Sequence, residues 1–177
     1  MKRVAILIAV LALAAACDDN DNPNQPSNTG PIVFTAQLSA ANEVPAISDA
    51  SEAGGRGTVT ITFNVPRDAS GNITGGGSAT FVGTLSGFPT SPNSVANNAH
   101  IHPGAAGTSG GVLVNAQLSA APITLDNAGN GSFNLTQPAL SQTDATAIAA
   151  NPAGYYFNVH TTKNPGGAVR GQLSRNP

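Results

Sequence analysis

Three histidines are the residues of this chain whose type and spacing best suit chemistry. His100 and His102 lie in the segment 99–104 (Ala-His-Ile-His-Pro-Gly), and His160 ends the segment 156–160 (Tyr-Phe-Asn-Val-His). Residues two apart on a β-strand project from the same face, about 6.6–6.8 Å apart, and a neighbouring strand lies about 4.8 Å away. His160 on that neighbouring strand would therefore meet the other two. Three imidazoles suit copper or zinc and leave one coordination position open.

The same histidines also suit a structural role, because an imidazole can donate to a backbone carbonyl and accept from an amide or threonine. Asn158, Thr161 and Asn164 are the expected partners. The copper/zinc superoxide dismutases carry a similar His-x-His pair on a β-sandwich strand. This chain has no further histidines and only one cysteine, so it lacks their bridging histidine and their disulfide, and we do not expect dismutase activity.

Glu43 and Arg170 form a second candidate pair. Charged residues make up only 9% of the chain, so a charge near each end of the domain stands out. We predict an ion pair that ties the first strand to the last, and removing either partner of a buried pair costs roughly 3–5 kcal/mol. The alternative assignment makes Glu43 a fourth metal ligand or a partner of His160.

Motifs for other catalysis are missing from the sequence. It has no Gly-x-Ser-x-Gly segment, and the glycines at 75–77 are not followed by the Lys-Ser/Thr of a phosphate-binding loop. The remaining carboxylates, Glu52 among them, lie in or near expected turns, where carboxylates are normally solvated, and none of their spacings indicates a glycosidase pair. We therefore expect no catalytic residues and do not expect the protein to be an enzyme. Copper or zinc is the cofactor that the histidines would suit, and no other cofactor is indicated.

Alternating polar and apolar residues predict the elements that position these side chains. The segment 58–65 alternates without interruption, which is typical of a half-buried antiparallel strand. A short helix is expected over 145–150, with Ser141 and Asp144 as a capping box. Together these patterns indicate an all-β fold, an antiparallel Greek-key β-sandwich or flattened barrel of about eight strands with one short helix. The other expected strands cover 32–40, 79–85, 99–102, 112–118, 131–136, 155–161 and 168–173.

The first residues have the pattern of an export signal. Lys2 and Arg3 precede an apolar run over 4–16, which is shorter than the about 20 residues needed to span a bilayer but suits a secretory signal peptide. The run ends at Cys17, the only cysteine, and this resembles a bacterial lipoprotein signal. We expect a signal peptide over 1–16 and lipidation of Cys17; an ordinary signal peptide followed by an unmodified cysteine is the alternative.

The segment 17–31 continues from the lipidated cysteine as a disordered tether, because it is rich in Asp, Asn and Pro. One β-domain over 32–177 follows. We expect an exported protein, anchored to a membrane in the periplasm or on the cell surface through Cys17. The part after the signal peptide has a net charge of −4 without a basic patch, so an envelope or extracellular protein or a polysaccharide is the expected partner, rather than nucleic acid.

Four segments in order resemble the CHRD domain, which is named for its repeats in the animal protein chordin. They begin at Phe34 (Phe-Thr-Ala-Gln-Leu-Ser-Ala-Ala-Asn-Glu-Val-Pro), Ala99 (Ala-His-Ile-His-Pro-Gly-Ala-Ala-Gly), Tyr156 (Tyr-Phe-Asn-Val-His-Thr) and Asn164 (Asn-Pro-Gly-Gly-Ala-Val-Arg-Gly-Gln-Leu). The resemblance covers about 32–174 and implies an exported β-domain without implying an activity. Ala168 stands where the family usually has a glutamate, which removes one carboxylate from this chain.

Overall fold

The computed structural model describes residues 30–90 and 92–177. The signal peptide expected over 1–16, Cys17 and nearly all of the tether expected over 17–31 lie outside the described residues. The described part contains one α-helix, α1 (Gln142–Ala150), and no helix within it is long and apolar enough to cross a membrane. Its strands are β1 (Ile32–Ser39), β2 (Arg56–Asn64), β3 (Gly77–Ser86), β4 (Val95–Pro103), β5 (Val114–Asn115), β6 (Ile123–Thr124), β7 (Gly131–Leu140), β8 (Tyr155–Thr161), β9 (Val169–Gln172) and β10 (Ser174–Arg175).

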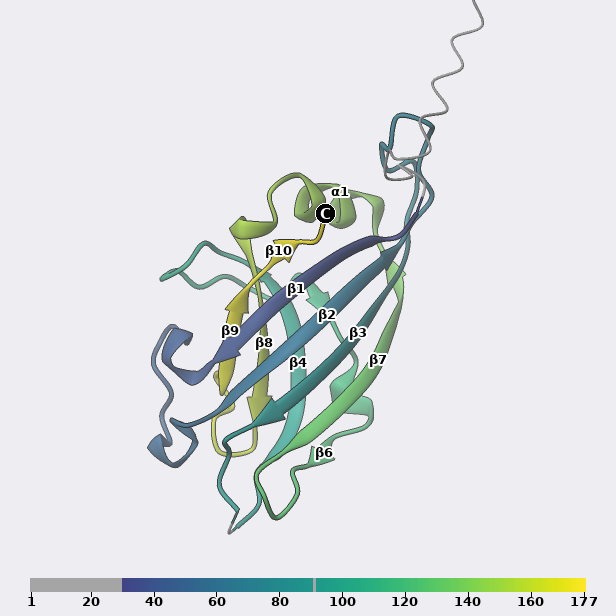
Figure 1. Cartoon of the computed structure of the whole chain (residues 1–177). Helices are drawn as coiled ribbons and strands as arrows, with labels where there is room; N and C mark the ends of the chain where they lie inside the picture. Colours follow the sequence, from purple (N-terminus) through teal and green to yellow (C-terminus); the bar gives the residue numbers. More distant parts are fainter. Residues whose placement is uncertain (1–29, 91) are drawn as a thin grey trace, which may run out of the picture.

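The strands form one antiparallel sheet in the order β5-β4-β8-β9-β1-β2-β3-β7, with β10 beside β1 and β6 beside β4. The sheet curls until its two ends approach each other (Figure 1). There the side-chain amide of Gln137 on β7 donates to the Asn115 carbonyl on β5 at 3.2 Å. The expected all-β antiparallel fold is thus confirmed, as a nearly closed, barrel-like sheet. It has ten strands rather than about eight, because β6 and β10, each of two residues, join the expected ones.

The sheet encloses an apolar core because its strands alternate. On β2, Val59 and Ile61 are buried whereas Thr60 between them is exposed. The ring of Phe157 on β8 stacks against those of Phe81 on β3, at 5.6 Å, and Phe133 on β7, at 6.2 Å. Strands from the two halves of the sheet order therefore pack face to face across the core.

The expected strand over 112–118 is much shorter in the structure, where only Val114–Asn115 pairs with β4. The Asn115 side chain accepts a hydrogen bond from the Gln117 amide at 2.7 Å, and Gln117 has a left-handed backbone with φ of 67°. This local turn ends the strand, and the chain continues as a short 3₁₀ helix over Leu118–Ala120.

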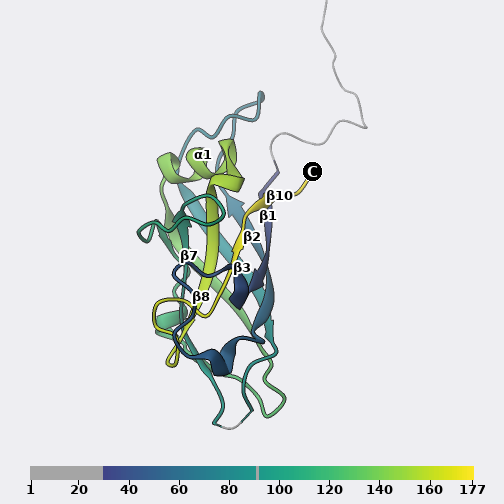
Figure 2. The ribbon, with the colours of Figure 1, turned by 90° about the vertical axis from the view of Figure 1, so that its left-hand side faces the viewer.

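The helix α1 forms where the sequence predicts it. Ser141 accepts a hydrogen bond from the Asp144 amide at 3.0 Å, and its hydroxyl donates to the Asp144 carboxylate at 2.6 Å. Ala145 and Ile148 are the buried residues of the helix, which lies at one end of the barrel-like sheet (Figures 1 and 2). A 3₁₀ turn over Pro152–Gly154 then leads the chain into β8.

Candidate metal centre

The strands β4, β8 and β9 carry rows of polar side chains across their outer face. His100 lies opposite Asn158, which in turn lies opposite Arg170. In the next row His102 lies opposite Tyr156. Directly opposed residues of antiparallel strands project from the same face, so each row is one cluster. All five of these residues are buried although they face away from the apolar core.

The three histidines converge at the edge of this polar face. Each offers one ring nitrogen, and the three nitrogens lie within 4.8 Å of one another. The closest two, Nδ1 of His100 and Nε2 of His160, are 3.1 Å apart. Ile101, between the first two histidines, is fully buried in the apolar core on the opposite face. The structure thus brings together the residues that the sequence predicted would meet.

Backbone carbonyls fix the orientation of two of the rings. Nδ1 of His160 donates to the Pro165 carbonyl at 2.9 Å, and Nδ1 of His102 donates to the Gly110 carbonyl at 3.0 Å. In a neutral imidazole that donates through Nδ1, Nε2 carries the lone pair. Histidines that bind metals almost always donate their other ring N–H to a carbonyl or carboxylate in this way. Both rings are therefore set to present Nε2 as a ligand.

The Asn158 side chain holds the remaining nitrogen of His102. Its carboxamide lies 3.0 Å from His102 Nε2. The atom at this distance is Asn158 Oδ1. Because the two ends of a carboxamide are interchangeable in shape, the turned amide would offer its nitrogen as a donor to a neutral His102 that carries its lone pair on Nε2. Asn158 is thus one of the histidine partners expected from the sequence. A metal ion at Nε2 would displace this hydrogen bond.

Burial favours the neutral form of His100 and His160. It lowers the pKa of His100 to about 4, with smaller contributions from the neighbouring His160 and His102. Burial also lowers the pKa of His160, against the bond to Pro165, which raises it. Because protons compete with metals for imidazole nitrogens, a low pKa leaves both rings available for a metal at neutral pH.

A stack of three side chains leads away from the centre. The Tyr156 ring lies parallel to the His102 ring, with centroids 4.8 Å apart. The guanidinium carbon of Arg170 lies 3.4 Å from the centre of the Tyr156 ring, a cation–π contact. Arg170 Nη2 also donates to the Ala105 carbonyl at 3.0 Å and to the Gln172 side chain at 3.2 Å. The centre is therefore built into a rigid polar layer.

Comparison with known families identifies the domain that carries this arrangement. The model of the CHRD domain matches residues 34–173, which include the three histidines, Glu43 and Arg170. The chain belongs to the CHRD domain family. No curated protein matches the chain. Family membership suggests a non-enzymatic β-domain and assigns it no ligand.

The structure places Glu43 of this CHRD domain apart from the histidines. The group of converging ligand atoms contains only the three rings, whereas the Glu43 carboxylate packs against Gly167, where an added Cβ would lie 2.6 Å from its Oε2. Burial raises the pKa of Glu43 to about 7, although the charge of Arg170 lowers it. Arg170 Nη1 and Glu43 Oε1 are buried without a hydrogen-bond partner among the described residues. The ion pair between them stays a prediction.

Sequence reasoning missed Glu52, which it placed among the solvated carboxylates near turns. The side chain is fully buried, and its Oε2 accepts hydrogen bonds from Thr161 Oγ1 at 2.6 Å and from Asn164 Nδ2 at 2.7 Å. Thr161 and Asn164, expected as partners of the histidines, thus bond to Glu52 instead. No local signal marks this contact, because Glu52 lies more than 100 positions before Thr161 and Asn164 in the chain.

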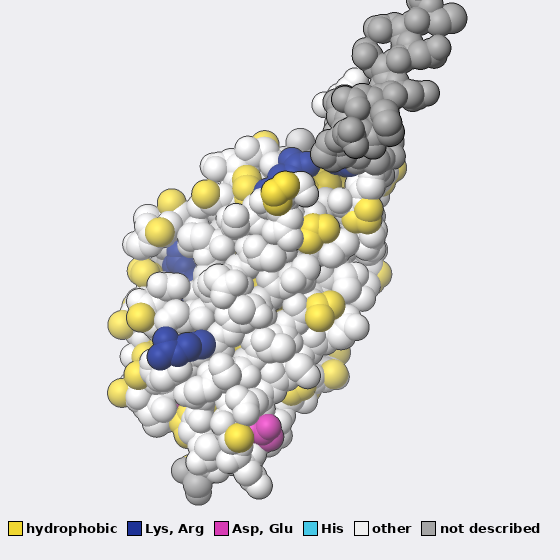
Figure 3. Space-filling model, in the orientation of Figure 1, with side chains coloured by type: hydrophobic (Ala, Val, Ile, Leu, Met, Phe, Trp, Pro, Cys, Tyr) yellow, Lys and Arg dark blue, Asp and Glu magenta, His cyan; other side chains and the backbone are white. Residues whose placement is uncertain are grey.

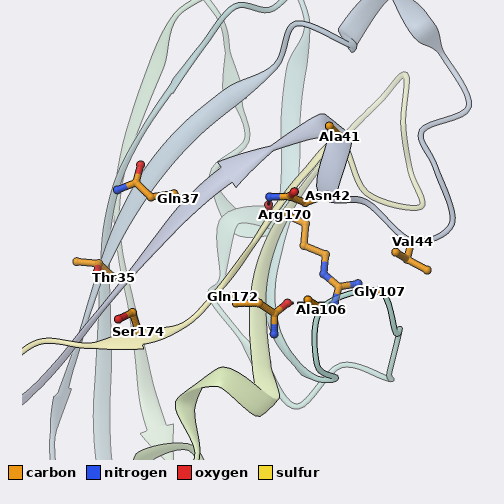
Figure 4. Close-up of a pocket in the computed structure, with 10 residues that line it drawn as sticks. All are labelled: Thr35, Gln37, Ala41, Asn42, Val44, Ala106, Gly107, Arg170, Gln172 and Ser174. Carbon is orange, nitrogen blue, oxygen red and sulfur yellow. Dashed lines mark hydrogen bonds between the residues drawn. The ribbon is translucent and has the colours of Figure 1, made fainter.

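A groove lies on the other side of Arg170 from the histidines. It encloses about 480 Å³ between β1, β9 and β10 and the loop that holds Ala106 and Gly107 (Figure 4). Its walls combine uncharged polar side chains with small apolar ones, and Arg170 is the charged residue among them. The lining residues are Thr35, Gln37, Ala41, Asn42, Val44, Ala106, Gly107, Arg170, Gln172 and Ser174.

Proposed function

We propose that this CHRD domain binds one copper or zinc ion through Nδ1 of His100 and Nε2 of His102 and His160, as a non-enzymatic module. The observation that supports this best is the convergence of the three ring nitrogens within 4.8 Å. Tetrahedral bonds of about 2.0–2.1 Å place ligand nitrogens about 3.3–3.4 Å apart. The pair at 3.1 Å would therefore separate slightly, and the more distant nitrogen would move closer. Imidazole is a ligand that suits both metals.

The surroundings of the rings also support a bound ion. Two rings already donate to carbonyls, and burial lowers the pKa of His100 and His160, so neutral imidazoles are available to an ion at neutral pH. Ion binding would replace two contacts, the one between His100 Nδ1 and His160 Nε2 and the one between His102 Nε2 and Asn158. Three neutral ligands leave the charge of the ion uncompensated and one position open to water or to an anion. Such a centre would store or sense the metal.

The test is the metal content and metal affinity of the full chain, purified without a histidine tag. We expect one tightly held ion per chain, and its loss in His100→Ala, His102→Ala and His160→Ala. A matched control is Thr60→Ala, on the exposed face of β2. Absence of stoichiometric copper or zinc after titration, with unchanged melting, would refute the proposal.

We also propose that the domain works at the cell envelope, anchored through a lipid on Cys17. The apolar run over 4–16 followed by the only cysteine supports this proposal. Two acyl chains suffice for stable anchoring. We expect Cys17→Ser to release the protein from membranes and to remove the acyl mass from its first peptide. A protein that remains membrane-bound after this change would contradict a lipid anchor at Cys17.

A second candidate function is the binding of an envelope protein or polysaccharide, which the groove beside Arg170 favours. Amide and hydroxyl side chains such as Gln37, Asn42 and Thr35 suit hydrogen bonding to such partners. Binding in this groove would be insensitive to chelators and would be lost in Ala106→Trp, which fills the groove from an exposed loop. Binding that a chelator abolishes would instead point to the histidine centre.

A further inference from the structure

The Pro165 carbonyl decides which nitrogen of His160 carries the proton. It accepts the hydrogen bond from Nδ1 at 2.9 Å, so Nε2 of His160 carries the lone pair and accepts from His100 Nδ1 at 3.1 Å. Free histidine side chains in water populate both tautomers, so the Nδ1–H form at His160 needs a carbonyl held in place. Pro165 lies in the exposed turn between β8 and β9, a type of segment that moves readily unless it is tied down.

Asn164, next to Pro165, ties this turn to a distant segment. Its side-chain oxygen accepts hydrogen bonds from the Ser48 amide at 2.9 Å and the Asp49 amide at 2.8 Å. Its side-chain nitrogen donates to the Asp49 carbonyl at 3.2 Å and to Glu52 Oε2 at 2.7 Å. Asn164 is 1% exposed, so the whole carboxamide is enclosed by the segment that it binds.

Glu52 closes the network from the other side. Its Oε2 also accepts from Thr161 Oγ1, and the same hydroxyl accepts from the Asn164 amide at 3.0 Å. The backbone of the turn adds a bond from the Thr161 amide to the Asn164 carbonyl at 3.3 Å. Thr161, which follows His160, and Asn164, which precedes Pro165, are thus both fixed to one buried carboxylate.

We propose that Glu52 and Asn164 are positioning residues for the metal centre, which hold the Pro165 carbonyl so that His160 presents Nε2 to the ion. This inference rests on the proposed metal-binding function. Apolar side chains would hold the β8–β9 turn against the segment 48–52 equally well, and they would avoid the cost of burying a carboxyl group. Directed hydrogen bonds are needed where the direction of one carbonyl matters.

The test compares Asn164→Ala and Glu52→Gln with two controls. Ser48→Ala removes one part-buried hydrogen bond to Asn164 and leaves the others in place, and Leu85→Ala on β3 destabilises the core at a strand that is not part of the network. The first measurement is the ¹⁵N NMR tautomer of His160 in the metal-free full chain. The second is the affinity for Zn²⁺, measured by competition with a chelator.

We expect His160 to be almost entirely Nδ1–H in the wild type and in both controls. In Asn164→Ala the Nε2–H form should become the major one, with a 10- to 100-fold loss of Zn²⁺ affinity, the range found when partners of metal-binding histidines are removed. Glu52→Gln keeps one acceptor oxygen and should show a smaller change of the same kind.

An unchanged His160 tautomer in Asn164→Ala, with a melting temperature lowered as in Leu85→Ala, would overturn the inference. If Asn164→Ala does not fold, Glu52→Gln decides it by the same tautomer measurement. Because the tautomer is measured without metal, its result stands even if the wild type binds no Zn²⁺, which would refute the proposed function separately.

Discussion

The two halves of the sheet use their outer faces in opposite ways. On β2 and β3 the outward side chains are exposed, as Thr60 and Val82 show, and no histidine is visible on the face drawn in Figure 3. On β4, β8 and β9 several outward side chains are as buried as the core: His100 is 6%, Asn158 3% and Arg170 1% exposed, whereas His160 at the edge is half-buried. One half thus has a single packed layer, and the other half has an apolar and a polar packed layer.

This difference indicates what the polar layer is for. Burying polar and charged groups costs free energy unless every group finds a partner, and well-packed apolar residues would often stabilise the domain more. The half with exposed threonines shows that this sheet can present an ordinary solvated face. We infer that the buried polar layer is present for its chemistry, with the histidines at its edge.

The largest difference in stability is expected when one arginine is removed from each half of the sheet. Arg170→Ala should destabilise the domain by about 3–5 kcal/mol, because it removes the contact with Tyr156 and leaves Glu43 without a nearby positive charge. Arg56→Ala, at an exposed position of β2, should change the free energy of unfolding by less than about 0.5 kcal/mol. Chemical denaturation measures both. Equal melting temperatures for the wild type, Arg170→Ala and Glu43→Ala would contradict the predicted ion pair.

The next effect depends on pH and isolates Glu43. Its pKa is raised to about 7 in the folded state, so the folded protein holds a proton that the unfolded chain has lost. The stability that this provides is fully present below pH 4.5 and disappears as the pH rises through 7. Relative to Glu43→Gln, the wild type should lose about 3 kcal/mol between these pH values. The histidines titrate in both proteins and cancel, so a flat difference curve would show that Glu43 is not protonated by burial.

Added metal should stabilise only a domain with all three histidines. Free Zn²⁺ at 100 times its Kd should raise the free energy of unfolding of the wild type by about 2.7 kcal/mol. Differential scanning calorimetry of the wild type, His160→Ala and Thr60→Ala tests this. The increase should persist in Thr60→Ala and vanish in His160→Ala; an equal increase in all three would place the ion elsewhere.

The smallest effect compares one neutral polar residue from each outer face. Asn158→Ala should cost about 1–3 kcal/mol, because it leaves the buried His102 nitrogen without a partner. Thr60→Ala, exposed on β2, should cost less than about 0.5 kcal/mol. If urea denaturation gives equal losses for the two variants, the polar layer is no more tightly packed than the solvated face.

The sequence predicted those parts of the fold that depend on local patterns. Alternation along 58–65 and a capped alanine-rich segment identify β2 and α1 directly. The meeting of the histidines follows from two strand spacings and from the pairing of β4 with β8. The strands β6 and β10 escaped notice because two residues carry no periodic pattern, and only pairing with distant strands defines them.

The partners of the polar layer could not be predicted in the same way. Thr161 directly follows His160, so its side chain projects from the opposite face of β8 and cannot serve the histidines. Glu52 has the local sequence of a turn residue, and only the tertiary fold brings it to Asn164. Loops that cover a sheet are placed by such long-range bonds, which leave no period in the sequence.

X-ray absorption spectroscopy of the full chain loaded with one equivalent of Zn²⁺ tests the metal centre most directly, because it counts imidazole ligands and gives their distances. We expect three imidazole nitrogens at about 2.0–2.1 Å and one further ligand that is not an imidazole, such as water. The same measurement on His102→Ala should show fewer imidazoles. A spectrum of the wild type with one imidazole or none around the ion would contradict the three-histidine centre.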